Sequence, residues 1–142
     1  FDLLKKTYRH SPILRYLLPR AGAKEVLGQI KKNGYSITLL TARNPDKDPN
    51  IKAITKKWLA KHCLPFNSIV FTKDKKMYVK QHEDRIVMVV EDYHETLDSF
   101  GELRTEIVVF KNDLNREIRQ PHFHQVSSWQ DIDRLFRHLI TK

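Results

Sequence analysis

Two adjacent carboxylates, Glu91 and Asp92, end an apolar run of the sequence at residues 86–90. Like charges side by side are unfavourable unless a cation is shared between them. Carboxylate oxygens are hard ligands of the kind that Mg²⁺ prefers. The pair therefore predicts a site for a divalent cation, with Mg²⁺ as the expected cofactor. A structural alternative is that Asp92 caps the helix expected next.

Polar groups that suit a phosphate follow two other apolar runs. Thr41 comes directly after residues 35–40, and Lys75 and Lys76 come shortly after residues 68–72. A hydroxyl can donate a hydrogen bond to a phosphate oxygen, and an ammonium group can offset the phosphate charge. Together with the acidic pair, these groups predict a site that holds a phosphate beside a metal ion. The alternative is that Thr41 only ends a strand and that the lysines are only solvated.

These groups need a scaffold that gathers several segments at one edge, and the sequence predicts an α/β fold. Four short runs rich in β-branched residues are expected to be strands covered on both faces of a parallel sheet. They are residues 35–40, 68–72, 85–90 and 106–110. Apolar residues at helical spacing predict helices around them, at residues 3–17, 23–32, 51–62, 94–103 and 127–142. Ser128 and Asp131 resemble a capping box at the start of the last helix.

The composition is that of one folded domain, with 142 residues of which 40% are hydrophobic. No run approaches the ~20 apolar residues that a membrane-spanning helix needs, so no membrane partner is expected. The single cysteine, Cys63, excludes an internal disulfide and is expected to be a buried thiol at a helix end. This cysteine usage fits an intracellular protein, cytoplasmic or mitochondrial.

Charge is distributed unevenly along the sequence. Residues 1–80 hold 18 Lys and Arg against 5 Asp and Glu, whereas residues 81–142 hold 8 against 12. The net charge is therefore +13 in the first part and −4 in the second, +9 in all. A basic half predicts attraction to a phosphorylated substrate or a nucleic acid. The alternative is a solvated lysine-rich surface.

Six pieces of the sequence form an ordered series: SPILRYLLPRAGAKEVL, ITLLTAR, IVFTKDK, VVEDYHETL, NR at 115–116, and VSSWQDI. In order and spacing they resemble the haloacid dehalogenase superfamily, in its branch of 5'(3')-deoxyribonucleotidase-like phosphatases. The similarity runs through nearly the whole chain. It implies a Rossmann-like three-layer sandwich with a parallel sheet. It also implies that residues 1–20 end a small helical cap, and that residues 21–142 are the α/β core without its first strand.

The resemblance also implies roles for single residues. Thr41 matches a phosphate-binding hydroxyl, and Lys75 or its neighbour Lys76 matches a catalytic lysine. Glu91 and Asp92 match the acidic pair that holds Mg²⁺ directly and through water. The remaining matches lie in loops expected to bind substrate, and they are Arg43, Asn115 and Arg116.

The sequence departs from this family in two respects. The family's nucleophile is an aspartate in a D-x-D segment after the first strand, but here D-x-D occurs only at residues 46–48 and 131–133, and neither follows an apolar run. Glu91 stands where the family usually has aspartate. The family's first strand would lie between the strands expected at 35–40 and 85–90. A leading segment, another chain or a different closure of the sheet is expected to fill that gap, because unpaired backbone groups in a dry interior are costly.

Two functions from different classes remain open. The first is a Mg²⁺-dependent phosphatase of nucleoside monophosphates or other small phosphomonoesters, which needs an aspartate nucleophile from a segment outside this chain. The second is a catalytically inactive scaffold subunit that binds RNA or a ribonucleoprotein assembly through its basic half. The retained hydroxyl, lysine and acidic pair favour the phosphatase.

Overall fold

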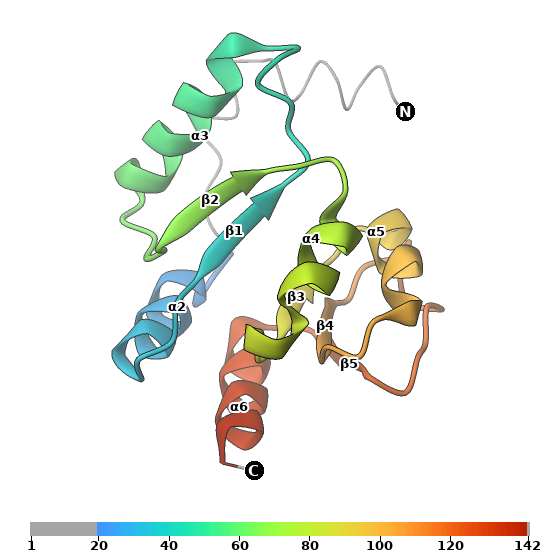
Figure 1. The fold of residues 1–142 in the computed structure, drawn as a ribbon. Coiled ribbons are helices and arrows are strands. Elements are labelled where there is room, and N and C mark those ends of the chain that lie inside the picture. Colours follow the sequence, from blue (N-terminus) through green and yellow to red (C-terminus); the bar gives the residue numbers. More distant parts are fainter. Residues whose placement is uncertain (1–19, 142) are drawn as a thin grey trace. The chain divides into compact units, whose positions relative to one another are not determined.

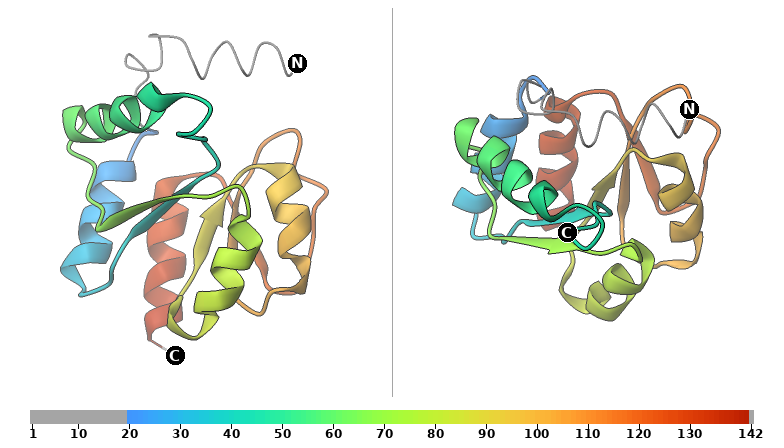
Figure 2. Two further views of the ribbon diagram at one scale, coloured as in Figure 1. Left: turned by 45° about the horizontal axis from the view of Figure 1, so that its top comes forward. Right: turned by 90° about the horizontal axis from the view of Figure 1, so that it is seen from above.

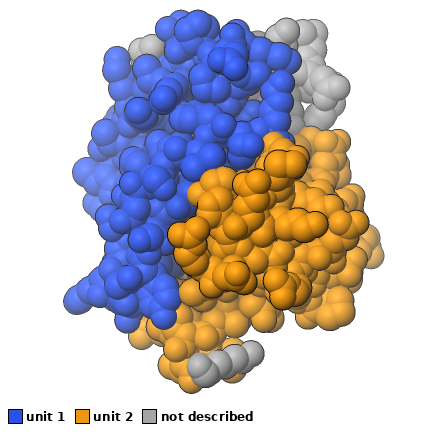
Figure 3. All heavy atoms as spheres, viewed as in Figure 1, with its two compact units in different colours: residues 1–73 blue, residues 74–142 orange. Residues whose placement is uncertain are grey.

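The structure is a computed structural model that describes residues 20–141. The helix expected at residues 3–17, and the cap segment except for its last residue, lie outside the described residues. The chain divides into two compact units, residues 1–73 and residues 74–142, which we call unit 1 and unit 2 (Figure 3). Each unit is described by itself below.

Unit 1 contains two helices and two strands within its described part. In chain order they are α2 (Ala23–Lys32), β1 (Thr38–Thr41), α3 (Pro49–Lys61) and β2 (Ser68–Phe71). Strands β1 and β2 form a two-stranded parallel sheet in which Thr38 lies opposite Ser68 (Figure 1). Both strands are shorter than the sequence predicts, and each is partly exposed along its length.

The helix ends of unit 1 follow from local chemistry. Asp48 caps α3, where its side chain accepts a hydrogen bond from the Asn50 amide at 3.0 Å. Pro49 occupies the first turn, where its missing N–H costs nothing. Beyond the end of α3, Cys63 takes a left-handed conformation with φ 52° and is exposed. The expectation of a buried thiol was therefore wrong, because this left-handed turn directs the side chain to solvent.

Unit 2 contains the second sheet. Its elements are α4 (Lys75–His82), η2 (Glu83–Arg85), β3 (Val89–Glu91), α5 (His94–Ser99), η3 (Phe100–Glu102), β4 (Ile107–Phe110), β5 (Phe123–Val126) and α6 (Trp129–Ile140). The three strands are parallel in the order β3-β4-β5. Helices α4 and α5 lie side by side, as Figures 1 and 2 show from different directions.

Strand β4 is the centre of this sheet. All four of its residues are buried, and Ile107, Val108 and Val109 have no exposed surface at all. The expectation of strands covered on both faces is met by β4, because its successive residues point to opposite faces of the sheet and all of them are buried. Edge strand β3 is partly open, and Val90 is 36% exposed. The core of unit 2 adds helical side chains, among them Leu97, Phe100, Ile132 and Phe136.

Helix α6 begins as its capping sequence predicts. The Ser128 hydroxyl accepts a hydrogen bond from the Asp131 amide at 3.1 Å, and the Asp131 carboxylate accepts one from the Ser127 amide at 3.0 Å. The reciprocal bond thus reaches one residue further back than in the usual capping box. Ile132 and Phe136 on the inner side of the helix are buried.

The α/β class with parallel strands is therefore confirmed, while three elements were not predicted. They are helix α4, which begins at Lys75, the short helix η2 that follows it, and strand β5. Strand β3 covers only the end of the run predicted at residues 85–90. Among residues 20–141, no helix combines the length and the hydrophobicity needed to cross a membrane.

Candidate functional site

The acidic pair lies at the carboxyl end of β3, where Glu91 is the last strand residue and Asp92 follows it. The Glu91 side chain folds back over the start of α5. Its Oε1 accepts hydrogen bonds from the backbone amides of Asp92 at 3.0 Å and Tyr93 at 3.1 Å. A carboxylate in this place also suits the positive end of a helix. The N-cap residue of α5 is Tyr93, and within the described residues no side chain makes a capping hydrogen bond to this helix, so the alternative that Asp92 caps it is not met. Glu91 instead holds the two amides that come just before the helix.

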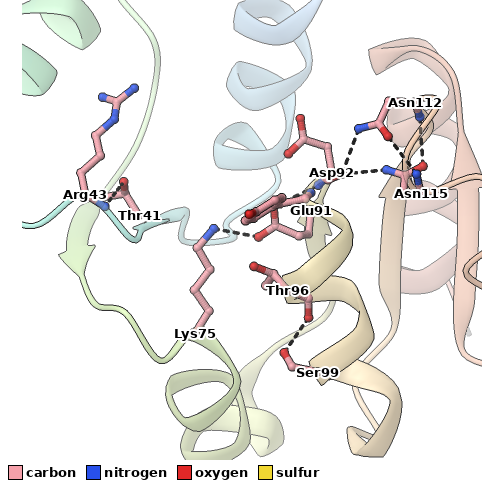
Figure 4. A network of polar contacts seen from close by, with 10 residues as sticks. Thr41, Arg43, Lys75, Glu91, Asp92, Thr96, Ser99, Asn112 and Asn115 are labelled. Atoms are coloured by element: carbon pink, nitrogen blue, oxygen red, sulfur yellow. Dashed lines mark hydrogen bonds and ion pairs between the residues drawn. The ribbon is translucent and has the colours of Figure 1, made fainter. Parts of the chain in front are cut away.

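Lys75 reaches the same carboxylate from the first turn of α4. Its Nζ lies 2.8 Å from Glu91 Oε2, and the two side chains are only 15% and 10% exposed (Figure 4). Asp74 starts this helix, since its side chain accepts a hydrogen bond from the Met77 amide at 3.0 Å. The cap fixes where α4 begins and so places Lys75 beside the end of β3.

Lys76 points to a different carboxylate. Its Nζ lies 2.6 Å from Glu102 Oε2, whose side chain is 78% exposed. The hydrogen bond and the charge of Lys76 lower the pKa of the Glu102 carboxyl below its usual value. Of the two lysines that the sequence left as alternatives, the structure thus brings Lys75 to the acidic pair and turns Lys76 away.

Two asparagines, Asn112 and Asn115, hold the backbone at the acidic pair, and we call them the asparagine bracket. The Asp92 carbonyl accepts hydrogen bonds from Asn115 Nδ2 at 2.7 Å and from Asn112 Nδ2 at 3.0 Å (Figure 4). Asn115 Nδ2 also donates to the Phe110 carbonyl at 3.0 Å, and Asn115 Oδ1 accepts from the Asn112 amide at 2.9 Å. The bracket ties the ends of β3 and β4 together.

Asn115 was expected to bind substrate, whereas its burial and its hydrogen bonds to the backbone indicate a structural role. It has no exposed surface, and both ends of its amide are used by backbone groups. We therefore assign it as a positioning residue. Arg116, also expected to bind substrate, has a 59% exposed side chain and pairs with Asp113. Asn112 was missed in the sequence, although the turn-forming series NDLN after an apolar strand could have indicated it.

Thr41 and Arg43 form a separate cluster in unit 1, at the end of β1. Thr41 Oγ1 accepts a hydrogen bond from the Arg43 amide at 3.2 Å. The Arg43 guanidinium donates to Thr55 Oγ1 at 2.9 Å, and this hydroxyl donates in turn to the Ile51 carbonyl at 2.7 Å. Arg43 is thus anchored to α3. Of the expected site residues, Thr41 and Arg43 thus belong to unit 1, and the contact between Lys75 and the acidic pair belongs to unit 2.

The chemistry of Glu91 and Asp92 can be compared with the ligands that Mg²⁺ requires. Within residues 20–141, no three or more His, Cys, Asp or Glu residues gather in a way that could hold a metal ion. Mg²⁺ sites commonly use one or two carboxylates, completed by water and substrate phosphate. The acidic pair fits that smaller requirement. Asp92 is exposed at the end of β3 and would be a ligand that solvent and substrate can reach, whereas Glu91 is held by Lys75 and by the backbone amides.

Comparison with protein-family models and with curated protein sequences found no match to this chain.

Proposed function

We propose that this chain is the larger part of a Mg²⁺-dependent phosphatase that acts on nucleoside monophosphates or similar small phosphomonoesters. The observation that carries the proposal is the contact of 2.8 Å between Lys75 Nζ and Glu91 Oε2 at the carboxyl end of β3, directly beside Asp92. Two elements that are distant in sequence meet there and supply a cation beside two carboxylates. This is the charge pattern required to hold a phosphate next to a metal ion.

The proposed roles follow from these contacts and from the resemblance to the haloacid dehalogenase superfamily. Lys75 offsets negative charge on the phosphate, and Glu91 orients Lys75. Asp92 is the main metal ligand, and bound Mg²⁺ would supply Lewis-acid stabilisation of the phosphate charge. By the resemblance, Thr41 donates a hydrogen bond to the phosphate. The same resemblance leads us to propose a Rossmann-like three-layer sandwich.

The nucleophile is proposed to be an aspartate on a strand from outside this chain. Neither D-x-D segment can serve, because Asp48 caps α3 and Asp131 sits in the first turn of α6. Strand β3 is an edge strand, and the partly exposed Val90 lies along it. A parallel strand that ends in D-x-D and pairs with this edge would bring a carboxylate to the same end as Asp92. Such a strand could belong to a leading segment or to another chain.

The test uses the natural polypeptide, whose intact mass and N-terminal sequence show whether it includes a D-x-D strand. Phosphate release from deoxynucleoside monophosphates is then measured with and without Mg²⁺. We expect activity that requires Mg²⁺, and a loss of about 100-fold or more in both Asp92→Asn and Lys75→Met. Mg²⁺ binding, followed by calorimetry without substrate, should weaken in Asp92→Asn.

Matched controls lie close to each of these residues. Lys76→Met removes a neighbouring lysine that pairs with Glu102, and Asp113→Asn removes a neighbouring acid that pairs with Arg116. Both controls should keep the activity of the wild type. Equal losses in Lys75→Met and Lys76→Met, or phosphate release that is indifferent to Mg²⁺, would contradict the proposal.

A further inference from the structure

Helix α3 carries four exposed lysines on the side that faces away from the unit 1 core. We call this the α3 lysine face, and it consists of Lys52, Lys56, Lys57 and Lys61. Their spacing of four and five residues spreads them over about half of the helix circumference. Two exposed alanines, Ala53 and Ala60, lie between them. The opposite side of the helix is packed, with Ile51 only 2% exposed and Leu59 only 6% exposed.

The positive charge of Lys52, Lys56 and Lys57 has little local compensation among the described residues. Helix α3 contains no acidic residue, and Asp48 at its N-cap is the nearest in sequence. Within the described part of the chain, none of Lys56, Lys57 and Lys52 forms an ion pair, although Lys52 Nζ lies 5.9 Å from the centre of the Phe71 ring. Unit 1 as a whole has 15 Lys and Arg against 4 Asp and Glu.

We infer that the α3 lysine face binds the phosphate backbone of a nucleic acid. The inference goes beyond the phosphatase proposal and does not depend on Lys75, Glu91 or Asp92. Lysine neutralises phosphates as a point charge without reading bases, so the expected binding is independent of base sequence. Lysines four residues apart are separated by about 6 Å along the helix axis, which lets one helix contact several phosphates at once.

The same face is poorly suited to two other anionic partners. A helix that binds a membrane surface needs large apolar side chains that enter the lipid, but Ile51 and Leu59 of α3 are buried, and no large apolar residue of this helix is fully exposed. Protein interfaces are centred on buried aromatic or arginine anchors and are poor in lysine. Only alanines lie between the lysines here, so a nucleic-acid backbone is the partner that the surface chemistry favours.

The salt dependence of binding gives a quantitative test. If four lysines each contact a phosphate of duplex DNA, raising the salt from about 50 to about 200 mM should weaken binding by about 150-fold. Removing two of these contacts should reduce the same salt effect to about 12-fold. Binding is measured by fluorescence anisotropy with a mixed-sequence DNA duplex, a single-stranded RNA and, separately, anionic phosphatidylserine vesicles.

The test variant is Lys56→Gln/Lys57→Gln, and the matched control is Lys24→Gln/Lys32→Gln, which removes the same charge from exposed positions of α2. We expect the α3 variant to bind more weakly with the smaller salt effect, and the α2 control to behave like the wild type. Lys56→Arg/Lys57→Arg should retain binding, which separates loss of charge from loss of folding.

Three outcomes would overturn the inference. They are equal weakening by the α2 and α3 variants, absence of binding to both nucleic acids at about 50 mM salt, and binding to the vesicles alone. The first would mean that total charge acts without a defined face. The last would mean that the partner is a lipid surface. Phosphatase activity is measured in parallel on the same variants, and it should not change.

Discussion

The two units use their charges in opposite ways. Unit 1 has 15 Lys and Arg against 4 Asp and Glu, whereas unit 2 has 11 against 13. In the described part of unit 2, six ion pairs join Lys or Arg to Asp or Glu, and the pair between Lys75 and Glu91 is the least exposed of them. Exposed pairs contribute little to stability. The charges of unit 2 thus form contacts within that unit, whereas Lys52, Lys56 and Lys57 of α3 form no ion pair with any residue in the range 20–141.

The two units also differ in how many hydrophobic residues they bury. Eleven hydrophobic residues are buried in unit 2, against five in the described part of unit 1. The sheet of unit 2 has a central strand with neighbours on both sides, whereas that of unit 1 is a single pair. Two strands alone are marginally stable in water, because too little apolar surface is covered. The proposed metal and phosphate groups Lys75, Glu91 and Asp92 are therefore built on the better packed unit.

The largest expected effect is a contrast in hydrogen exchange between the two sheets. The backbone amides of β4 should exchange at least about 100-fold more slowly than those of β1 and β2, a difference of about 3 kcal/mol in opening free energy. The reason is that β4 is fully buried while β1 and β2 are partly exposed. Native-state exchange followed by NMR measures this directly. Equal protection would contradict the contrast and would indicate that the unit 1 sheet is paired along another edge.

A smaller effect is expected at the asparagine bracket. Asn115→Ala removes a donor from the Asp92 carbonyl and from the buried Phe110 carbonyl, so the free energy of unfolding should fall by about 1 to 3 kcal/mol. Chemical denaturation measures the loss. Asn112→Ala is the matched comparison, because Asn112 is exposed and its loss should cost less. If the two variants were equally stable, the bracket would not depend on the buried amide.

Much of the scaffold could be predicted from sequence, because periodic apolar patterns report burial directly. Helices α2, α3 and α6 follow the predicted segments closely, and the cap of α6 was identified from Ser128 and Asp131. Strand β5 was missed because Phe123–Val126 is neither continuously apolar nor β-branched throughout, and it gains its place from pairing with β4. Helix α4 was missed because its buried face is reduced to Val79, although Asp74 is a good N-cap residue.

The candidate site was predictable in type more than in detail. The acidic pair stood out because two charges follow an apolar strand, and that depends on the sequence alone. The choice between Lys75 and Lys76 could not be made from the sequence. It depends on where α4 starts and on the direction in which each lysine side chain leaves the helix. The burial of Asn115 could not be read from sequence either, since a polar side chain becomes buried only where backbone groups need its hydrogen bonds.

The smallest expected effect concerns acid stability at the start of α6. The hydrogen bond from the Ser127 amide, helped by Arg134, lowers the pKa of the Asp131 carboxyl below its usual value. A lowered pKa means that folding favours the charged form, so this stabilisation is complete well above about pH 4 and is lost as the pH falls through the lowered pKa. Asp131→Asn should therefore flatten the fall in stability between about pH 5 and pH 3.

The measurement is thermal unfolding at several pH values for the wild type and the variant. Asp98→Asn serves as the control, because Asp98 is an exposed acid of α5 in the same unit. It should leave the acid dependence unchanged. If Asp131→Asn and Asp98→Asn gave the same curve as the wild type, the Asp131 hydrogen bonds would contribute nothing to acid stability. The Asp131 side chain is 33% exposed and its charge is screened by solvent, so the effect should be small. Absence of the effect would argue against stabilisation of unit 2 by its own charges.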